Sequence, residues 1–124
     1  MQAGFNRCAH ACLAMVASHC GVDIGPDHWL RQGGPLSTMP SAWDLMSWAR
    51  GLGLVAEAVA FEFEEIGQLR VPAILHCGNR HFVVLEGVDE SQVAIVDPRR
   101  GRLRTSMALA RDLFSGIAIE IAPR

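Results

Sequence analysis

The hydrophobic period of this chain changes near its middle, and that change limits the folds it can adopt. Residues 8–19 form a largely apolar run without glycine or proline, and residues 41–49 carry one apolar face with helical spacing. Beyond residue 54 the apolar residues alternate or form short runs, as strands do. Helices followed by strands is the α+β arrangement, in which helices pack on an antiparallel sheet.

The expected elements follow from this pattern and from its turn residues. The first half should contain three helices, over residues 8–19 ending at Gly21, over 26–30 before a Gly33-Gly34-Pro35 turn, and over 41–49 after the N-cap Ser41. The second half should contain about five short strands, over residues 55–61, 71–75, 82–85, 93–96 and 117–121. Residues 62–69 and 107–114 are expected to be short helical connections.

Composition limits the number of domains and the kinds of partner. With 124 residues, half of them hydrophobic, the chain suits a single domain spanning residues 1–124. A formal net charge of −2 argues against nucleic acid or an anionic membrane, because both attract clustered basic residues. The arginines at positions 99, 100, 102 and 104 are interpreted as a solvated turn and strand edge. No apolar run approaches the roughly 18 residues that span a bilayer, and no secretory signal is present, so we expect a soluble, cytosolic domain.

The four cysteines, at positions 8, 12, 20 and 77, are expected to be free thiols. A helix amino terminus lowers the pKa of a thiol, because its unpaired N–H groups and the helix dipole favour the thiolate. Cys8 is predicted to start the first helix, whereas Cys12 and Cys20 lie inside the helix and beyond its end. Position therefore makes Cys8 the candidate nucleophile and the other two packing residues.

A thiolate nucleophile needs a proton partner, and His81 lies at the start of a predicted strand. The next strand, residues 93–96, is followed by Asp97, so an ordinary hairpin would place this carboxylate near the entry of the His81 strand. Asp97 could then fix the tautomer of the imidazole as the third member of a triad. Gln2 could place its amide near the carbonyl under attack and form an oxyanion hole with the backbone N–H of Cys8.

Each of these residues also has a simpler structural interpretation. A cysteine on an apolar helix is usually part of the core, a histidine at a strand start usually lies on the surface, and an aspartate before proline usually forms a turn. The joint order of Cys8, His81 and Asp97 favours catalysis over these separate roles. The other histidines, at positions 10, 19, 28 and 76, lack such neighbours.

Two further groups of residues are disfavoured as sites. A metal site built from Cys8, Cys12, His19 and Cys77 would place two ligands on one helix, without the short turns that separate the ligands of structural zinc sites. No metal or cofactor is therefore expected. The tryptophans at positions 29, 43 and 48 are expected to pack in the core and not to line a groove.

Several motifs, in order along the chain, resemble one family of peptidases. Gln2 is followed by Cys8 and then by Ala-Cys-Leu-Ala-Met at residues 11–15. The later motifs are Pro-Ala-Ile-Leu-His at 72–76, His-Phe-Val-Val-Leu at 81–85, Asp-Pro-Arg-Arg-Gly at 97–101 and Ser-Gly-Ile-Ala at 115–118. On these motifs nearly the whole chain resembles the bacteriocin-processing cysteine peptidases of the colicin V exporter type, which form the cytosolic amino-terminal domain of peptide-exporting ABC transporters.

The resemblance implies a papain-like α+β fold and a cysteine endopeptidase that removes the leader of a ribosomally made peptide after a Gly-Gly pair. It matches Cys8 to the nucleophile, His81 to the general base and acid, Asp97 to the orienting carboxylate and Gln2 to the oxyanion residue. It also implies two partners, the leader peptide and the transmembrane and ATP-binding domains of the same transporter, at the cytoplasmic face of the bacterial inner membrane. The domain itself is expected to be monomeric and to bind neither nucleic acid nor a cofactor.

The chain departs from the family pattern beside these motifs, at Arg7, Ala9, Cys77 and Arg80, and Cys77 stands where the family usually has tryptophan. Two alternatives to peptide cleavage stay open. One is a domain that docks a leader or another cargo without cutting it, and the other is a cysteine-dependent acyl transfer such as deamidation. A Gly-Gly leader peptide separates them, because only a peptidase yields two fragments.

Overall fold

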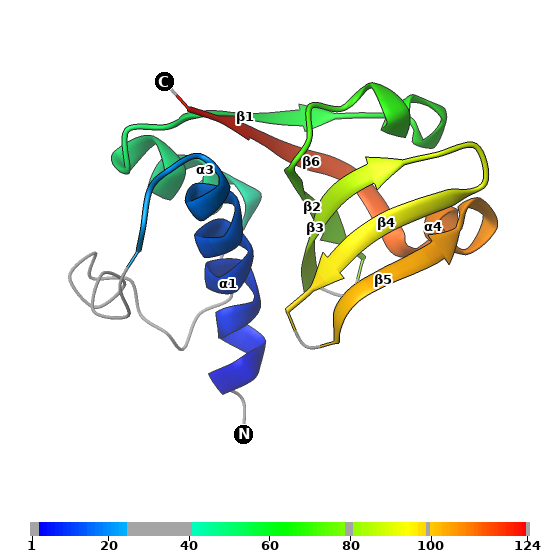
Figure 1. Ribbon diagram of the computed structural model, residues 1–124, viewed down its shortest axis with the longest axis horizontal. Helices are drawn as coiled ribbons and strands as arrows, with labels where there is room; N and C mark the ends of the chain where they lie inside the picture. The colour runs from blue at the N-terminus through cyan, green and yellow to red at the C-terminus, as the bar shows by residue number, and fades with distance from the viewer. Residues whose placement is uncertain (1–2, 25–40, 79–80, 99, 124) are drawn as a thin grey trace.

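The computed structural model describes residues 3–24, 41–78, 81–98 and 100–123, with the backbone alone for residues 3–7. Its two longer helices lie to one side of a single antiparallel sheet (Figure 1). The α+β arrangement predicted from the change of hydrophobic period is therefore confirmed. No helix in the described ranges is long and apolar enough to cross a membrane.

The two longer helices, α1 (Ala3–His19) and α3 (Ala42–Gly51), pack on the same face of the sheet. The predicted N-cap of α3 is confirmed: the hydroxyl of Ser41 accepts a hydrogen bond from the N–H of Asp44 at 3.1 Å, and the Asp44 carboxylate accepts one from the N–H of Ser41 at 2.8 Å. This reciprocal pair satisfies two N–H groups that the helix leaves without partners, and so fixes where α3 begins. The short helix and turn predicted over residues 26–35 lie outside the described residues.

The start of α1 differs from the prediction. We expected the helix to begin at Cys8, but it begins at Ala3. Residues 3–7 contain no proline, and once a helix is nucleated each added residue gains a backbone hydrogen bond, so the helix continues through them. The end of α1 agrees with the prediction, because Gly21 adopts a φ of 87°, which glycine tolerates better than other residues.

The sheet has six strands in the spatial order β1-β6-β2-β3-β4-β5, and all neighbours are antiparallel. These strands are β1 (Val55–Ala60), β2 (Ala73–Cys77), β3 (His81–Val88), β4 (Gln92–Asp97), β5 (Gly101–Ser106) and β6 (Phe114–Ala122). Five of them correspond to predicted strands. The sequence does not predict β5, because this edge strand alternates arginines with only one large apolar residue, Leu103.

Two short helical segments connect the strands near the places predicted. The 3-10 helix η1 (Phe63–Gln68) follows β1, and α4 (Met107–Leu113) lies between β5 and β6. Both contribute buried residues to the sheet face opposite α1 and α3.

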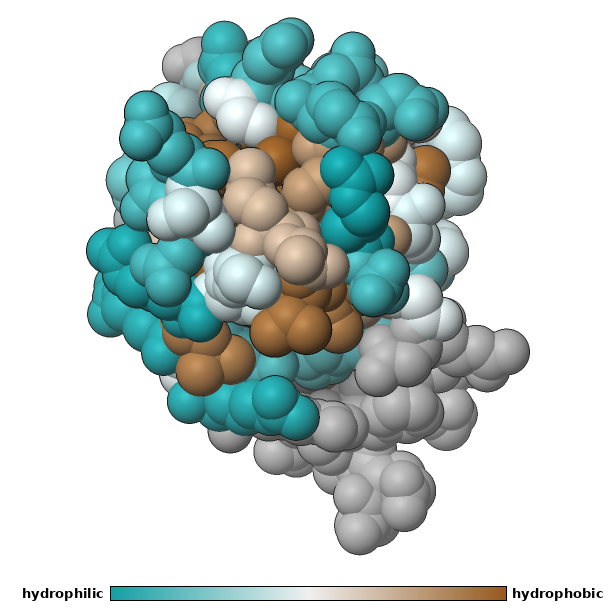
Figure 2. Space-filling view, turned by 90° about the vertical axis from the view of Figure 1, so that its right-hand side faces the viewer, coloured by the Kyte–Doolittle hydropathy of each residue, from teal (hydrophilic) through white to brown (hydrophobic). Residues whose placement is uncertain are grey.

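On the side of the molecule shown in Figure 2, a strip of apolar side chains reaches the surface and is surrounded by hydrophilic ones.

The core has two parts because strand residues alternate between the faces of the sheet. The part under the helices includes Cys8, Cys12, Leu13, Val16, Leu45, Ile74, Phe82 and Ile119. The part on the other face includes Ile66, Leu75, Val83, Leu85, Ile95, Ala110 and Ala118. The first part brings α1 against β3, which is the contact on which the site depends.

Candidate active site

Cys8 lies on the side of α1 that faces the sheet, at the start of strand β3. Its sulfur is 3.0 Å from Nδ1 of His81, although the two residues are far apart in the sequence. The thiol also lies 3.0 Å from the carbonyl oxygen of Phe82, to which it can donate, and the backbone N–H of Phe82 donates to the sulfur at 3.3 Å. The main chain of β3 therefore holds the sulfur in line with the imidazole.

His81 and Asp97 meet across the β3–β4 hairpin. The register pairs Val84 with Val96, so Asp97, at the end of β4, lies near the start of β3. Nε2 of His81 is 3.1 Å from a carboxylate oxygen of Asp97, and the two side chains are 14% and 11% exposed. In this low-exposure setting the carboxylate fixes the orientation of the ring.

The three side chains form a continuous line from sulfur to imidazole to carboxylate. Nδ1 of His81 faces Cys8, and Nε2 faces Asp97. The imidazole can therefore take the thiol proton at one nitrogen while the other donates to the carboxylate. This is the arrangement needed for nucleophilic catalysis with a base that a third group orients.

The pKa of Cys8 is lowered from 9.0 to about 7. The largest cause is a hydrogen bond from the thiol of Cys12, and the N–H of Phe82 and the charge of His81 act in the same direction. Burial and the charge of Asp97 oppose this lowering. A thiol with a pKa near 7 is partly ionised at neutral pH without losing its nucleophilicity.

The origin of this low pKa differs from the sequence prediction. We attributed it to a helix amino terminus, but Cys8 lies beyond the first turn of α1, where the influence of the helix dipole has faded. The oxyanion prediction changes for the same reason. A backbone N–H at this point of an α-helix bonds to the carbonyl four residues earlier, so that of Cys8 is not free to bind an oxyanion.

Cys12, predicted only to pack, also affects the pKa of Cys8. It lies four residues after Cys8 on the same helix face and is fully buried. The hydrogen bond to Cys8 and burial raise the pKa of Cys12, which therefore stays protonated and can donate. The signal was present in the sequence, because residues four apart on a helix are neighbours.

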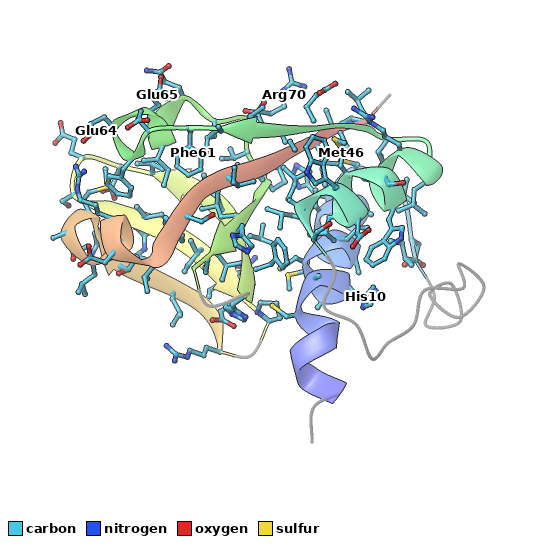
Figure 3. The ribbon with its side chains drawn as sticks, turned by 180° about the vertical axis from the view of Figure 1, so that it is seen from behind. His10, Met46, Phe61, Glu64, Glu65 and Arg70 are labelled. Atoms are coloured by element: carbon cyan, nitrogen blue, oxygen red, sulfur yellow. The ribbon has the colours of Figure 1, made fainter. Side chains whose placement is uncertain are left out.

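The remaining candidates lie elsewhere. Gln2 lies outside the described residues. His10 projects from the side of α1 away from the sheet, where it stacks on Trp48 with ring centroids 4.9 Å apart (Figure 3). Trp43 is 67% exposed, so its predicted place in the core is wrong. All four cysteines are free thiols, and no group of three or more potential metal ligands occurs among the described residues.

Two hollows lie on opposite faces of the sheet. The first, of about 390 Å³, lies between the start of α3 and strands β1 and β6, with Trp43, Val59, His76 and Ile117 in its wall. His76 packs edge-on against Phe82, whose main chain bonds the sulfur of Cys8. We call this hollow the helix-side groove. The second, of about 290 Å³, lies on the opposite face and has His81 and Asp97 in its own wall.

The fold and the aligned Cys–His–Asp side chains define a papain-like cysteine peptidase. The chain belongs to the peptidase C39 family, whose family model matches residues 1–124. It is 34% identical over 117 residues to the probable microcin-H47 secretion/processing ATP-binding protein MchF of Escherichia coli. It is 32% identical over 117 residues to the colicin V secretion/processing ATP-binding protein CvaB of the same species. Each match covers 94% of this chain and 17% of the relative, so the chain spans about a sixth of their length.

Solved structures show the same fold. The chain is similar to a double glycine motif protease from an AMS/PCAT transporter, crystallised with the leader peptide, with a TM-score of 0.85 and 29% identity over 96% of this chain and 86% of that one. It is also similar to the peptidase domain of Streptococcus ComA, a bifunctional ABC transporter, with a TM-score of 0.82 and 26% identity over 97% and 93% of the two chains.

Proposed function

We propose that this chain is the endopeptidase that removes the leader of a ribosomally made peptide after a Gly-Gly pair, as part of a peptide-exporting ABC transporter. The observation that carries the proposal is the line of Cys8, His81 and Asp97, with separations of 3.0 and 3.1 Å. The names of its relatives, which include a double glycine motif protease and secretion/processing ATP-binding proteins, supply the substrate class and the transporter.

The reaction begins with transfer of the thiol proton of Cys8 to Nδ1 of His81. The thiolate attacks the carbonyl carbon of the second glycine and forms a C–S bond. His81 then protonates the nitrogen of the next residue, the C–N bond breaks, and the released peptide departs with a free amine. Water, deprotonated by the same histidine, hydrolyses the thioester and restores the thiol. Asp97 stabilises the imidazolium during both halves of the reaction.

Gln2 is proposed to supply the amide donor of the oxyanion hole. The N–H of Cys8 is engaged in the helix, so a side-chain donor is needed to stabilise the charge on the carbonyl oxygen. Loss of one such donor costs about 100- to 1000-fold in turnover, and Gln2→Ala should therefore fall in this range. Gln2→Glu, which offers acceptors in place of the amide donor, should be at least as damaging.

The burial of the nucleophile favours a glycine pair as its target. Cys8 is only 2% exposed, so a substrate must approach the sulfur through a narrow passage. Two successive glycines offer no side chains to clash with its walls, whereas larger residues would be excluded. Specificity at the cut would then come from steric exclusion more than from attraction.

The helix-side groove is the proposed site for the helical part of the leader. Its wall is mainly apolar, and the exposed Trp43 forms part of it. An amphipathic leader helix could lay its apolar face in this groove and pass its carboxyl end along Phe82 to the sulfur. Binding at this distance from the cut would supply affinity that the two glycines cannot.

The place of action is proposed to be the cytoplasmic face of the bacterial inner membrane, where the peptidase would act beside the transmembrane and ATP-binding domains of its transporter. There it would meet the precursor before export. The domain itself is proposed to be monomeric, because one chain supplies all three members of the triad.

The test is incubation of the protein with a synthetic Gly-Gly leader peptide, followed by mass spectrometry. We expect two fragments that separate after the second glycine. Cys8→Ala should abolish cleavage while the leader still binds, and the matched control Cys20→Ala should cleave normally because Cys20 has no contact with the triad. Binding without cleavage by the unaltered protein would contradict the proposal and favour a docking domain, and release of ammonia would favour a deamidase.

A further inference from the structure

The second hollow, on the sheet face opposite the helices, has several wall residues that take no part in the proposed reaction. Its volume is about 290 Å³, and it is lined by Cys77, Val83, Ile95, Leu103 and Phe114. The catalytic pair, His81 and Asp97, forms part of the same wall, together with Arg100, Arg104 and Thr105. We call it the hairpin cavity, because most of it lies on the β3–β4–β5 strands.

The position of His81 decides which part of a substrate this cavity faces. During cleavage the imidazole must protonate the departing nitrogen, so the residue that carries this nitrogen lies beside the ring. The helix-side groove lies on the other face of the sheet, and its wall residue His76 packs against Phe82, whose main chain bonds the sulfur of Cys8. The hairpin cavity, which has the ring of His81 in its wall, is therefore on the side of the leaving group.

The size and lining of the cavity indicate what it can hold. An engineered cavity of about 150 Å³ lined by apolar side chains holds a benzene ring, so the larger space here has room for an aromatic side chain. Six of its wall residues, Leu113 included, are apolar or weakly polar, and three of them, Cys77, Val83 and Ile95, are less than a tenth exposed. A large apolar side chain would gain more there than a small one.

We propose that the hairpin cavity is the subsite for the first residue of the released peptide, and that it selects a large apolar side chain at that position. This inference rests on the proposed peptidase function and adds a second specificity determinant to it. The peptidase would select the leader side of the cut by excluding side chains, and the side of the released peptide by binding one.

The test compares leader peptides that differ only in the residue after the second glycine. The full chain should cleave the phenylalanine peptide with a kcat/KM about tenfold higher than that of the alanine peptide, since burying an aromatic ring is worth roughly one such factor or more. A second pair carries alanine or phenylalanine at the fourth residue after the cut. That residue lies about 10 Å further along an extended chain, so this pair should show no preference.

Two variants that fill the hairpin cavity from different walls test whether the preference for phenylalanine arises in this cavity. In Cys77→Leu and in Leu103→Trp the ratio of kcat/KM for phenylalanine over alanine should fall towards one. The matched control Leu109→Trp places the same bulk on the exposed side of α4 and should keep the ratio. Circular dichroism identifies any variant that fails to fold. If one filling variant does not fold, the ratio of kcat/KM is compared in the other.

The outcomes separate this inference from the function on which it rests. Cleavage of both peptides at equal rates by the unaltered protein would overturn the subsite and leave the peptidase intact. A preference that persists in folded variants of both walls would also overturn it, because the selecting surface would then lie elsewhere. Failure to cleave either peptide would contradict the peptidase function, and the subsite with it.

Discussion

The two faces of the sheet would contribute different parts of the proposed reaction. The face covered by α1 and α3 brings the nucleophile, Cys8, and the helix-side groove, both in an environment of packed apolar side chains. The opposite face brings the base and the carboxylate, His81 and Asp97, and the hairpin cavity. They meet because β3 begins at His81, where the imidazole at the end of the sheet reaches around to the sulfur. The proposed reaction would therefore take place at this end of the sheet, where one substrate can contact residues of both faces.

The strongest way to break this division of roles is to remove the base. His81→Ala should lower kcat/KM for leader cleavage by about 100- to 10,000-fold, the range that a positioned acid–base group supplies. Leader binding, measured by fluorescence polarisation, should persist because the helix-side groove is unchanged. His76→Ala is a useful contrast, since His76 bonds Ser115 at 2.8 Å and lies in the groove wall. It should weaken leader binding more than turnover.

A smaller effect is expected from the carboxylate. Asp97→Ala should lower kcat by about 100-fold, because a ring that loses its orienting partner no longer holds the proton at the required place. Asp97→Asn keeps an acceptor for Nε2 of His81 and should recover part of this loss. Equal activity of the alanine and asparagine variants would argue that Asp97 acts only through its charge.

The third prediction concerns the pH dependence that Cys12 gives to Cys8. The active form is the thiolate, and the hydrogen bond from Cys12 is the largest cause of its lowered pKa of about 7. Cys12→Ala removes the donor, so the pKa of Cys8 should rise and the acid limb of the kcat/KM profile should move to higher pH. Activity should therefore fall more at pH 6 than at pH 9.

Cys12→Ser keeps a donor at the same place and should leave the acid limb close to that of the unaltered protein. If Cys12→Ala lowers kcat/KM by the same factor at every pH, and the acid limb of the profile does not move, then Cys12 has a packing role alone.

The smallest expected effect concerns stability and belongs to the helical face. Ser41→Ala removes the side chain that caps α3 and should lower the free energy of unfolding by about 1 kcal/mol. Asp44→Ala removes the other half of the same capping box. Denaturant unfolding should show that the double variant loses less than the sum of the two single losses, because the two bonds form one unit. Additive losses would contradict a reciprocal cap.

The sheet was more predictable than the environment of the sulfur. The alternation of β4 and the apolar run of β3, joined by a short turn, implied a hairpin, and that hairpin brings His81 and Asp97 together. The missed strand, β5, lies at the edge of the sheet, where exposed arginines replace the apolar residues that mark a buried strand. Patterns of burial therefore predict the central strands better than the edges.

The first helix shows what sequence alone does not reveal. The apolar run indicated a buried helix but not where that helix begins, because residues without a cap or a proline give no boundary signal. The low pKa of Cys8 was expected, but its source is a neighbouring thiol and the main chain of β3, contacts that depend on how α1 packs on the sheet. The packing of α1 on the sheet therefore determines the pKa of Cys8.

The most direct test of the central claim, that Cys8 is a nucleophile activated beside His81, is the rate of Cys8 alkylation by iodoacetamide as a function of pH. Mass spectrometry of the modified peptides follows each cysteine separately. We expect a midpoint near pH 7 for Cys8, a higher midpoint for Cys20, whose pKa burial raises, and an upward shift of the Cys8 midpoint in His81→Ala. A Cys8 midpoint at the ordinary thiol value of about 8.5, unchanged in His81→Ala, would contradict the claim.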